Sequence, residues 1–506
     1  MGGSEYVFGG FLLNPQDGDT YLAKMRQGWQ GSWTFTLPYT ANPGEGVYLF
    51  LYYLFLGHMA RLTGASTILT FHAARLIGAV GLLLALWRFF GATMPTSGTR
   101  QLAFCLAVFG SGLGWLGALL GVFTSDLWVA EAYPFLSAYA NAHFPLGLAL
   151  MVWLVTPGQA GEKVNPVHHR YQKWLNSGIW AFVASLVLGL VMPFGVVVVC
   201  VVLAGLAVWE IVEKWSEAKR SIHDFRVKTI GMPESPWTVR RLLAVLLGGG
   251  LPILYAVWVT STHPVLRGWN AQNLTPSPSS WDFALSFSPA LLFALPGAWA
   301  IWRDRESNGR VLLVWGVLGI LLMYLPIGLQ RRLLSGMMIP LAGLAVMGVA
   351  HLSGGNHRRK LVLVGLLFML AIPSNLIVLL SGVNGIQTRA ALLYISRDEL
   401  AGFTWLEEHS QQNAVVLTGP ETGLFIPAYT GRRVIYGHPY ETVDAASRKS
   451  AVEQFFKKPE DKRESNIVQE VDLIFFGPRE KALATPGTFD SQPELFRQGE
   501  VVIYGK

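Results

Sequence analysis

The sequence predicts an α-helical polytopic membrane protein of about 10 transmembrane helices, followed by a small C-terminal α/β domain. Of its 506 residues, 52% are hydrophobic and only 14% are charged, whereas soluble domains average about 25% charged residues. From about residue 68 the chain alternates between apolar stretches suited to crossing a bilayer and short polar loops. The chain has a net charge of +7, and in a membrane protein such an excess of basic residues mostly reflects the cytoplasmic loops. We therefore expect no nucleic-acid partner.

Ten apolar segments carry the predicted membrane crossings. They are residues 68–90, 101–122, 143–156, 176–191, 194–213, 241–260, 283–302, 311–329, 332–351 and 361–380. A further apolar segment, 45–63, contains His58 and Arg61 and is rich in Tyr and Phe. Aromatic rings favour the membrane–water interface, so we expect this segment to lie there as a helix. Cys105 and Cys200 both fall inside apolar segments, which indicates core packing rather than a disulfide framework or a metal site.

Lysine and arginine are distributed unevenly between alternate loops. Eighteen lie in loops 88–100, 157–175, 213–241, 303–310 and 352–360, and three lie in loops 123–142, 192–193, 261–282 and 330–332. Basic residues accumulate in cytoplasmic loops, so the first set is predicted to be cytoplasmic. This predicts a protein of the bacterial plasma membrane with its catalytic loops and C-terminal domain extracytoplasmic. A chain that starts outside also predicts a first transmembrane helix upstream that is missing from this sequence.

The chain divides into three predicted domains. Residues 1–67 form an outward acidic loop with interfacial helices, residues 68–380 form the transmembrane bundle, and residues 381–506 form the α/β domain. In the last domain, helical patterns cover 397–409 and 444–457. Short apolar runs predict strands at 414–417, 433–436, 472–476 and 501–504.

Acidic and basic residues stand out in the segments predicted to face outward. The candidate site residues are Asp17, Glu131, Arg331 and Arg332, with Asp19, Asp126 and His143 as secondary candidates. A carboxylate at the mouth of a lipid-lined cavity acts as a general base or holds a divalent metal. Guanidinium groups bind phosphate bidentately. The set therefore indicates a site that uses a lipid phosphate and a polar acceptor at the outer leaflet.

Ordinary structural roles remain as alternatives for these residues. Asp17 lies in a Pro-Gln-Asp-Gly sequence that is typical of a turn. The other acids fit solvated loop residues, the histidine fits the start of a helix, and the arginines fit anchors at the membrane interface. Farther along the chain, His438 and Glu441 fit either contacts to an acceptor or a structural turn and helix cap.

The order of these motifs resembles that of the GT-C membrane glycosyltransferases, the superfamily that includes protein mannosyltransferases and the aminoarabinose transferase of lipid A. The matching pieces are Asp17-Gly18-Asp19-Thr20-Tyr21-Leu22, the helix 45–63, Ala74-Arg75-Leu76, the turn at 91–100 and Glu131 in the second outward loop. The resemblance covers the whole chain in architecture and is specific in its motifs over residues 14–145. Many relatives have two adjacent acids where this chain places Gly18 between Asp17 and Asp19.

The resemblance implies a GT-C fold and an inverting glycosyltransferase. Such an enzyme moves a sugar from a polyprenyl-phosphate-linked donor to a protein, lipid or glycan acceptor. Asp17 would be the catalytic base or the acid that orients the acceptor, with Asp19 as the other candidate. Glu131 would position the acceptor or a metal, and Arg331 and Arg332 would bind the donor phosphate, a match by position. No cofactor is certain: Mg²⁺ or Mn²⁺ would be held by the three acids, but a leaving group with a single phosphate often needs no metal.

Two other functions stay open. One is a transporter or flippase for a lipid-linked sugar, which would carry charges in the middle of its spans and broken paired helices. The span interiors are nearly free of charge, with Arg75 as the main exception near an outer end, and this disfavours transport. The other is a non-catalytic assembly protein of the cell envelope that has the same fold.

Overall fold

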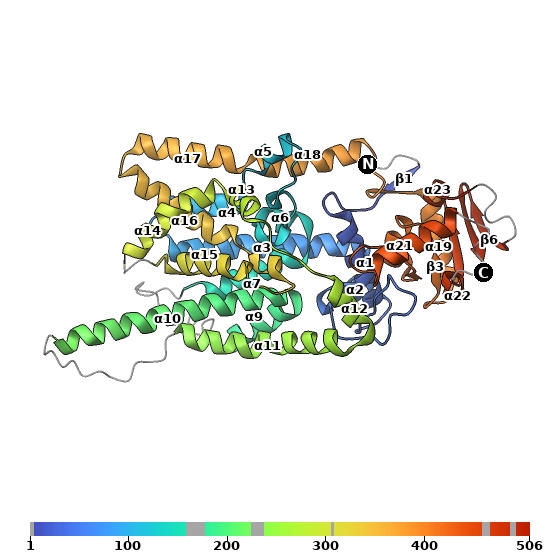
Figure 1. The fold of residues 1–506 in the computed structure, drawn as a ribbon, viewed down its shortest axis with the longest axis horizontal. Helices are drawn as coiled ribbons and strands as arrows, with labels where there is room; N and C mark the ends of the chain where they lie inside the picture. The colour runs from blue at the N-terminus through green and yellow to red at the C-terminus, as the bar shows by residue number, and fades with distance from the viewer. Residues whose placement is uncertain (1–4, 158–177, 224–236, 305–307, 458–465, 486–491) are drawn as a thin grey trace. The chain divides into compact units, whose positions relative to one another are not determined.

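The computed structural model describes residues 5–157, 178–223, 237–304, 308–457, 466–485 and 492–506 (Figure 1). These residues belong to two compact units. Unit 1 comprises Met1–Ala74, Ala256–Leu274 and Leu380–Lys506, and unit 2 comprises Arg75–Tyr255 and Thr275–Leu379. The division into domains at residues 67 and 380 stays a prediction. Most of the predicted loop 157–175, and parts of 213–241 and 303–310, lie outside the described residues.

Unit 2 is a bundle of apolar helices. It contains most of α3 (Thr67–Thr93) and α11 (Trp237–Thr262), part of α18 (Pro373–Gln387), and α4 (Ser97–Phe109), α5 (Gly114–Leu119), α6 (Pro134–Ala140), α7 (His143–Val155), α9 (Gly178–Val191), α10 (Pro193–His223), α13 (Ser280–Phe287), α14 (Ala290–Arg303), α15 (Arg310–Met323), α16 (Met338–Ser353) and α17 (His357–Ala371). Its short 3-10 helices are η1 (Ser125–Leu127), η2 (Ala130–Ala132) and η3 (Gln330–Leu334). Helices therefore occupy the segments where apolar spans were predicted.

Within the described residues, five helical segments are long and apolar enough to cross a membrane. They are Thr67–Thr93, Ser97–Leu119, Pro193–Ser216, Trp237–Thr262 and His357–Gln387. The pair α13 and α14, bent by 83°, makes a sixth if it is one span, and α7, α9, α15 and α16 are apolar but shorter. The protein is thus an integral membrane protein, and the number of about 10 crossings stays a prediction.

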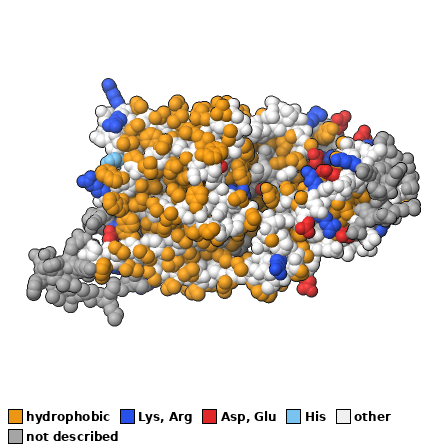
Figure 2. All heavy atoms as spheres, in the orientation of Figure 1, with side chains coloured by type: hydrophobic (Ala, Val, Ile, Leu, Met, Phe, Trp, Pro, Cys, Tyr) orange, Lys and Arg blue, Asp and Glu red, His pale blue; other side chains and the backbone are white. Residues whose placement is uncertain are grey.

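Hydrophobic side chains cover much of unit 2 on the face that Figure 2 shows. On α3, Leu76, Ile77, Val80 and Leu84 are each more than half exposed. Their spacing places them along one face of the helix. An exposed stripe of large apolar side chains is stable against lipid and would be costly against water.

Glycines allow two helices of unit 2 to approach closely. A Cβ atom on Gly297 of α14 would lie 1.9 Å from the Leu344 carbonyl oxygen of α16, and one on Gly348 would lie 1.9 Å from the Phe293 carbonyl oxygen. Small residues at such positions let helix backbones pack directly in a membrane bundle. The crossing of α14 and α16 therefore depends on these two residues.

Unit 1 joins the beginning and the end of the chain. Strand β1 (Tyr6–Phe8) pairs antiparallel with β2 (Tyr394–Ser396), with Val7 opposite Ile395. The helices α1 (Pro15–Trp29), α2 (Leu51–Thr63) and α12 (Pro264–Gln272) belong to the same unit. Helix α1 packs against both α2 and α20 (Thr422–Thr430).

The rest of unit 1 is an α/β domain. Its five-stranded sheet has the order β4-β3-β5-β7-β6, formed by β3 (Val415–Leu417), β4 (Arg433–Val434), β5 (Leu473–Phe476), β6 (Glu494–Gln498) and β7 (Val501–Gly505). Strand β3 is parallel to β4 and β5, and β7 is antiparallel to β5 and β6. The helices of the domain are α19 (Arg397–His409), α20, α21 (Ala445–Lys457), α22 (Asn466–Gln469) and α23 (Pro478–Lys481).

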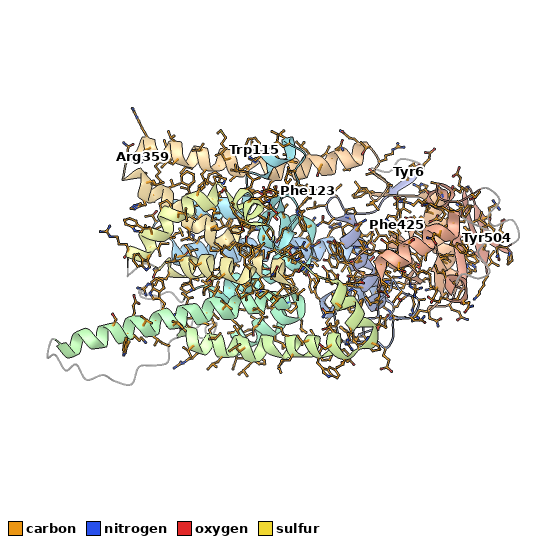
Figure 3. The ribbon with its side chains drawn as sticks, in the orientation of Figure 1. Tyr6, Trp115, Phe123, Arg359, Phe425 and Tyr504 are labelled. Atoms are coloured by element: carbon orange, nitrogen blue, oxygen red, sulfur yellow. The ribbon has the colours of Figure 1, made fainter. Side chains whose placement is uncertain are left out.

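Side chains that alternate along β5 pack on different helices. Ile474 belongs to a cluster with Phe456 of α21, whereas the Phe475 ring lies 5.4 Å from that of Phe403 in α19. Successive side chains of a strand point to opposite faces of its sheet. The two helices therefore cover the two faces. Figure 3 labels Tyr504 of β7 and Phe425 of α20 in this domain.

Two local predictions were wrong. The acidic segment around Asp17 was expected to be a loop, but it forms the first turn of α1. Strand β6 was not expected, because its sequence Glu-Leu-Phe-Arg-Gln carries polar residues at most positions. An edge strand tolerates such a sequence because one of its sides has no strand partner.

Candidate active site

Helix α1 begins immediately before the acidic pair. Asn14 takes a left-handed conformation, Pro15 occupies the first turn and Asp17 follows in the same turn. Proline suits this place because the first N–H groups of a helix have no carbonyl partner within the helix, so the N–H that proline lacks is not missed. An acid is stabilised there by the helix dipole. Asp17 and Lys24, seven residues apart, lie on one face of the helix.

Two glycines fix the crossing of α1 with α2. A Cβ atom on Gly28 would lie 2.1 Å from the Leu54 carbonyl oxygen, and one on Gly57 would lie 1.9 Å from the Met25 carbonyl oxygen. Backbone therefore touches backbone at this crossing. The position of α1 in unit 1 is set by this contact as well as by its packing on α20.

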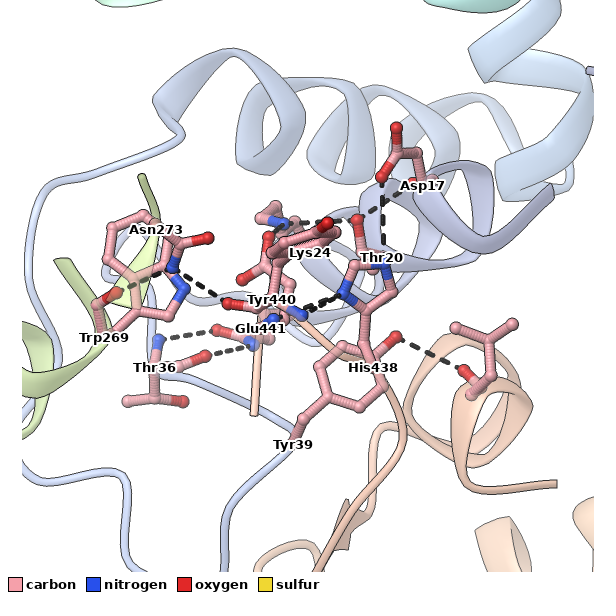
Figure 4. Close-up of polar contacts among 12 residues, drawn as sticks. Asp17, Thr20, Lys24, Thr36, Tyr39, Trp269, Asn273, His438, Tyr440 and Glu441 are labelled. Carbon is pink, nitrogen blue, oxygen red and sulfur yellow. Dashed lines mark hydrogen bonds and ion pairs between the residues drawn. The ribbon is translucent and has the colours of Figure 1, made fainter. Parts of the chain in front are cut away.

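The Asp17 carboxylate faces His438, which comes from a turn of the α/β domain (Figure 4). His438 Nε2 lies 3.7 Å from Asp17 Oδ1. The Asp17 side chain is 47% exposed, whereas that of His438 is 4% exposed. Burial lowers the pKa of the His438 imidazole, because desolvation outweighs the attraction of the Glu441 and Asp17 carboxylates. His438 is therefore held neutral at neutral pH.

Beside this contact, Lys24 forms a buried ion pair with Glu441 (Figure 4). Lys24 Nζ lies 2.8 Å from Glu441 Oε1, and the two side chains are 1% and 13% exposed. The ammonium group also lies 4.6 Å from the centre of the Phe50 ring. A buried cation requires such partners, since an unpaired charge is costly away from water. The pair joins α1 to the turn that carries His438.

Asp19 differs from Asp17 although it lies two residues away. Its side chain is buried, and its Oδ1 atom has no hydrogen-bond partner among the described residues. Burial raises the pKa of the Asp19 carboxyl well above its ordinary range, against a smaller opposing effect of the Arg479 charge. Asp17 is thus the acid of this pair that a ligand in solvent can reach.

In unit 2, Glu131 of η2 pairs with both arginines of η3. Arg332 Nη1 lies 3.1 Å and Arg331 Nε lies 3.7 Å from Glu131 Oε1. The Arg331 guanidinium also lies over the Trp128 ring, 4.5 Å from its centre. The Glu131 side chain is 4% exposed, against 19% for Arg331 and 31% for Arg332. The structure thus brings together three of the residues predicted from the sequence.

Asp126 has partners that favour a structural role. Its carboxylate accepts hydrogen bonds from the amides of Gly112 and Gly114 at 3.1 and 3.0 Å and from the Thr124 hydroxyl at 2.7 Å. These bonds hold the break between α4 and α5. His143, the other secondary candidate, begins α7, where its ring lies 4.1 Å from that of Phe144.

Arg75 also supports the backbone. Its Nη1 atom donates to the carbonyl oxygens of Ala138 and Tyr139 at 2.7 and 3.0 Å. These carbonyls belong to the last turn of α6, where they have no partner within the helix. The Arg-containing element of the predicted motif therefore caps a neighbouring helix in unit 2.

A divalent cation needs several oxygen or nitrogen ligands around one point. Among the residues that the structure describes, no group of three or more His, Cys, Asp and Glu side chains has that arrangement. Near Asp17 the neighbouring side chains are an imidazole and an ammonium already paired with Glu441. The side chains around Asp17 do not fit a metal site.

Lys24 was not among the residues predicted for the site, and His438 and Glu441 each fitted two roles. His438 has features of both: its Nδ1 atom caps a turn, and its Nε2 atom faces Asp17. The helical spacing of Asp17 and Lys24 was a usable signal once Pro15 was read as a helix start. Their partners lie more than 400 residues away, and no local pattern indicates such a pairing.

Similar proteins were found by comparing structures and not by comparing sequences. The sequence matches no protein-family model, and comparison with curated proteins found no match. The structure is similar to ArnT from Cupriavidus metallidurans bound to undecaprenyl phosphate, with a TM-score of 0.51 and 13% identity over 98% of this chain and 94% of that one. It is also similar to the Archaeoglobus fulgidus oligosaccharyltransferase tethered with an acceptor peptide, with a TM-score of 0.52 and 12% identity over 93% of this chain. This chain spans 65% of the length of the oligosaccharyltransferase. The protein has the fold of the GT-C membrane glycosyltransferases.

Proposed function

We propose that the protein is an inverting glycosyltransferase that moves a sugar from a polyprenyl-phosphate donor to an acceptor on the outer face of the membrane. The observation that carries the proposal is the fold, which is shared with the undecaprenyl-phosphate-bound ArnT over nearly the full length of both chains. Undecaprenyl phosphate is the lipid of the proposed donor. A protein, a lipid or a glycan can serve as the acceptor.

Asp17 would act on the acceptor hydroxyl. The acceptor oxygen attacks the anomeric carbon and forms the new glycosidic bond, the bond from that carbon to the phosphate oxygen breaks, and Asp17 takes the hydroxyl proton. The lipid leaves as polyprenyl phosphate. The partly exposed Asp17 carboxylate supports this role better than the buried Asp19 does.

Arg331 and Arg332 would bind the phosphate of the donor. Their guanidinium groups remain partly exposed while Glu131 neutralises one of the two charges from the buried side. A phosphate that gains negative charge as the sugar leaves is stabilised by such fixed cations. Glu131 would then hold the two arginines in place. No step of this reaction is assigned to a metal ion.

The transporter alternative predicts charged residues inside broken spans. The bent pair of α13 and α14 carries Asp282. Its carboxylate accepts hydrogen bonds from the Ser125 amide, the Ser125 hydroxyl and the Ser286 hydroxyl at 2.9, 2.7 and 2.7 Å. These bonds favour a structural role for Asp282, so this break does not favour transport.

A binding experiment tests the donor lipid without knowledge of the sugar. Purified protein in nanodiscs is titrated with undecaprenyl phosphate, and its melting temperature and Kd are measured. We expect saturable binding that weakens about tenfold in Arg331→Gln, because one charged hydrogen bond to phosphate contributes about 1.5 kcal/mol. Arg267→Gln, a variant of a residue in α12, is the control and should bind as the wild type does.

Transfer is then measured with a panel of undecaprenyl-phosphate sugars and envelope extracts as acceptors. Release of undecaprenyl phosphate with inversion at the anomeric carbon supports the proposal. Movement of intact donor between the leaflets of a vesicle, with no new glycosidic bond, would instead indicate the flippase. Binding with neither activity would indicate the non-catalytic assembly protein.

A further inference from the structure

The turn that carries His438 is held rigidly within unit 1. The Thr442 hydroxyl accepts hydrogen bonds from the amides of Gly437 and His438, both at 3.3 Å. From α12, the side-chain amide of Gln272 donates to the Thr442 carbonyl oxygen at 2.6 Å, and that of Asn273 donates to the Tyr440 carbonyl oxygen at 2.9 Å. The turn is therefore fixed both by its own bonds and by a separate helix.

The same turn determines which nitrogen of His438 carries the proton. The backbone amides of Tyr440 and Glu441 both donate to Nδ1, at 3.1 and 3.2 Å. An atom that accepts two hydrogen bonds cannot carry a hydrogen itself, so the neutral ring is protonated on Nε2. Nε2 is the atom that faces Asp17 Oδ1. The imidazole thus presents an N–H to the carboxylate.

The other groups around His438 preserve this arrangement. The Lys24 ammonium on α1 opposes protonation of the imidazole, and the Glu441 carboxylate on the turn favours it. These two charges are paired with each other at 2.8 Å, so their effects on the ring largely cancel. The rings of Tyr39 and Tyr440 lie 6.3 and 6.0 Å from the imidazole. His438 is left as a neutral donor directed at one acid.

We propose that His438 is a positioning residue that orients the Asp17 carboxylate for the transfer reaction, so that the C-terminal α/β domain contributes directly to the active site. This inference rests on the proposed function. An N–H directed at one carboxylate oxygen leaves the other oxygen to receive the acceptor proton. The α/β domain then does more than cover the active site or bind the acceptor.

Substitutions at His438 test the proposal. His438→Ala removes the donor, and we expect kcat to fall about 10- to 100-fold with the donor KM changed less than about twofold, because a misplaced base mainly affects the chemical step. His438→Gln keeps an N–H near Nε2 and should recover most of kcat.

Two controls separate a local effect from misfolding. His409→Ala changes an exposed histidine of the same α/β domain and should leave kcat and the donor KM unchanged. Melting temperatures are measured for Asp17→Asn, His438→Ala and the double variant. Since the two side chains are in contact, their effects should not add. Additive effects would show that the contact does not exist and would overturn the proposal without reference to activity.

The outcomes also distinguish this inference from the proposed function. If the wild type transfers sugar and Asp17→Asn does not, wild-type kcat in His438→Ala would overturn only the role of His438. A loss of kcat in His438→Ala that Gln does not recover would indicate a purely structural residue and would overturn the role as well. If the wild type transfers no sugar from any donor of the panel, the proposed function fails and this inference fails with it.

Discussion

The two charged clusters of the protein are built in opposite ways. In unit 1 the cation Lys24 is buried and paired, while the acid Asp17 is almost half exposed. In unit 2 the acid Glu131 is buried, while its partners Arg331 and Arg332 keep part of their surface exposed. The first cluster offers a carboxylate to a ligand and the second offers guanidinium groups. The difference suits a hydroxyl acceptor in one case and a phosphate in the other.

The largest expected effect concerns the exposed acid. Asp17→Asn removes the proposed base, and we expect transfer to fall by about 10²- to 10⁴-fold, the range of general-base catalysis. Its melting temperature should stay close to that of the wild type, because the side chain is half exposed. Initial rates of sugar transfer check this. Glu408→Gln, at an exposed acid of α19, is the matched control, and near-normal rates in Asp17→Asn would refute the contrast between the clusters.

The buried cation should matter for stability. Lys24→Met leaves the Glu441 carboxylate buried without its partner, which costs about 3–5 kcal/mol of unfolding free energy. The double variant Lys24→Met/Glu441→Leu should recover most of that loss. Denaturant unfolding of the purified protein measures both. Arg448→Gln breaks the pair with Glu470, whose side chains are 35% and 26% exposed, and should cost less than about 1 kcal/mol. Equal losses at the two sites would contradict the prediction.

The buried acid of α1 gives a prediction on pH. The pKa of Asp19 is raised in the folded protein, so the folded state keeps a proton that the unfolded state loses as pH increases. Its contribution to stability is present below the ordinary carboxyl range and is lost as pH rises through the raised folded pKa, by at most about 1.4 kcal/mol per pH unit. Asp19→Asn should therefore raise the melting temperature more at pH 8 than at pH 5. A larger rise in melting temperature at pH 5 than at pH 8 would contradict the raised pKa of Asp19.

The smallest expected effect concerns Glu131 and its arginine partners in unit 2. Glu131→Gln keeps a hydrogen-bond acceptor for the arginines and removes the charge that competes with phosphate. We expect undecaprenyl phosphate to bind about fivefold more tightly, a gain of about 1 kcal/mol. The same nanodisc titration measures this Kd. Weaker binding would mean that the charge of Glu131 is needed to orient the guanidinium groups.

Local features of the sequence predicted much of the fold. Apolar stretches identified the helices of unit 2, and the helix at 397–409 was found from a pattern that the structure explains by a capping box between Ser396 and Glu399. The helical start at Asp17 was missed because Asp and Gly there were taken as turn residues, although Pro15 signals a first turn. Each of these features depends on neighbours within a few residues.

The site could be predicted only in part. Glu131, Arg331 and Arg332 were predicted as site residues, and the structure joins them across 200 residues of chain. No pattern in the sequence connected Asp17 with His438 or Lys24 with Glu441. Those pairs arise because α1 packs on the α/β domain, and such packing depends on surface shape and on the Gly28–Gly57 crossing rather than on any local pattern.

The pairing of β1 with β2 has a consequence for how the protein is made. The ribosome completes β1 and α1 before unit 2, but β2 and the Glu441 partner of Lys24 emerge only after all of unit 2 has been synthesised. Strand β1 and a lysine in need of a counter-ion must therefore wait for their partners until residues 394–441 have been made. Biogenesis of this protein thus includes a delayed closure in which residues made after unit 2 secure residues made before it. A nascent chain arrested before residue 394 should expose α1 to proteolysis.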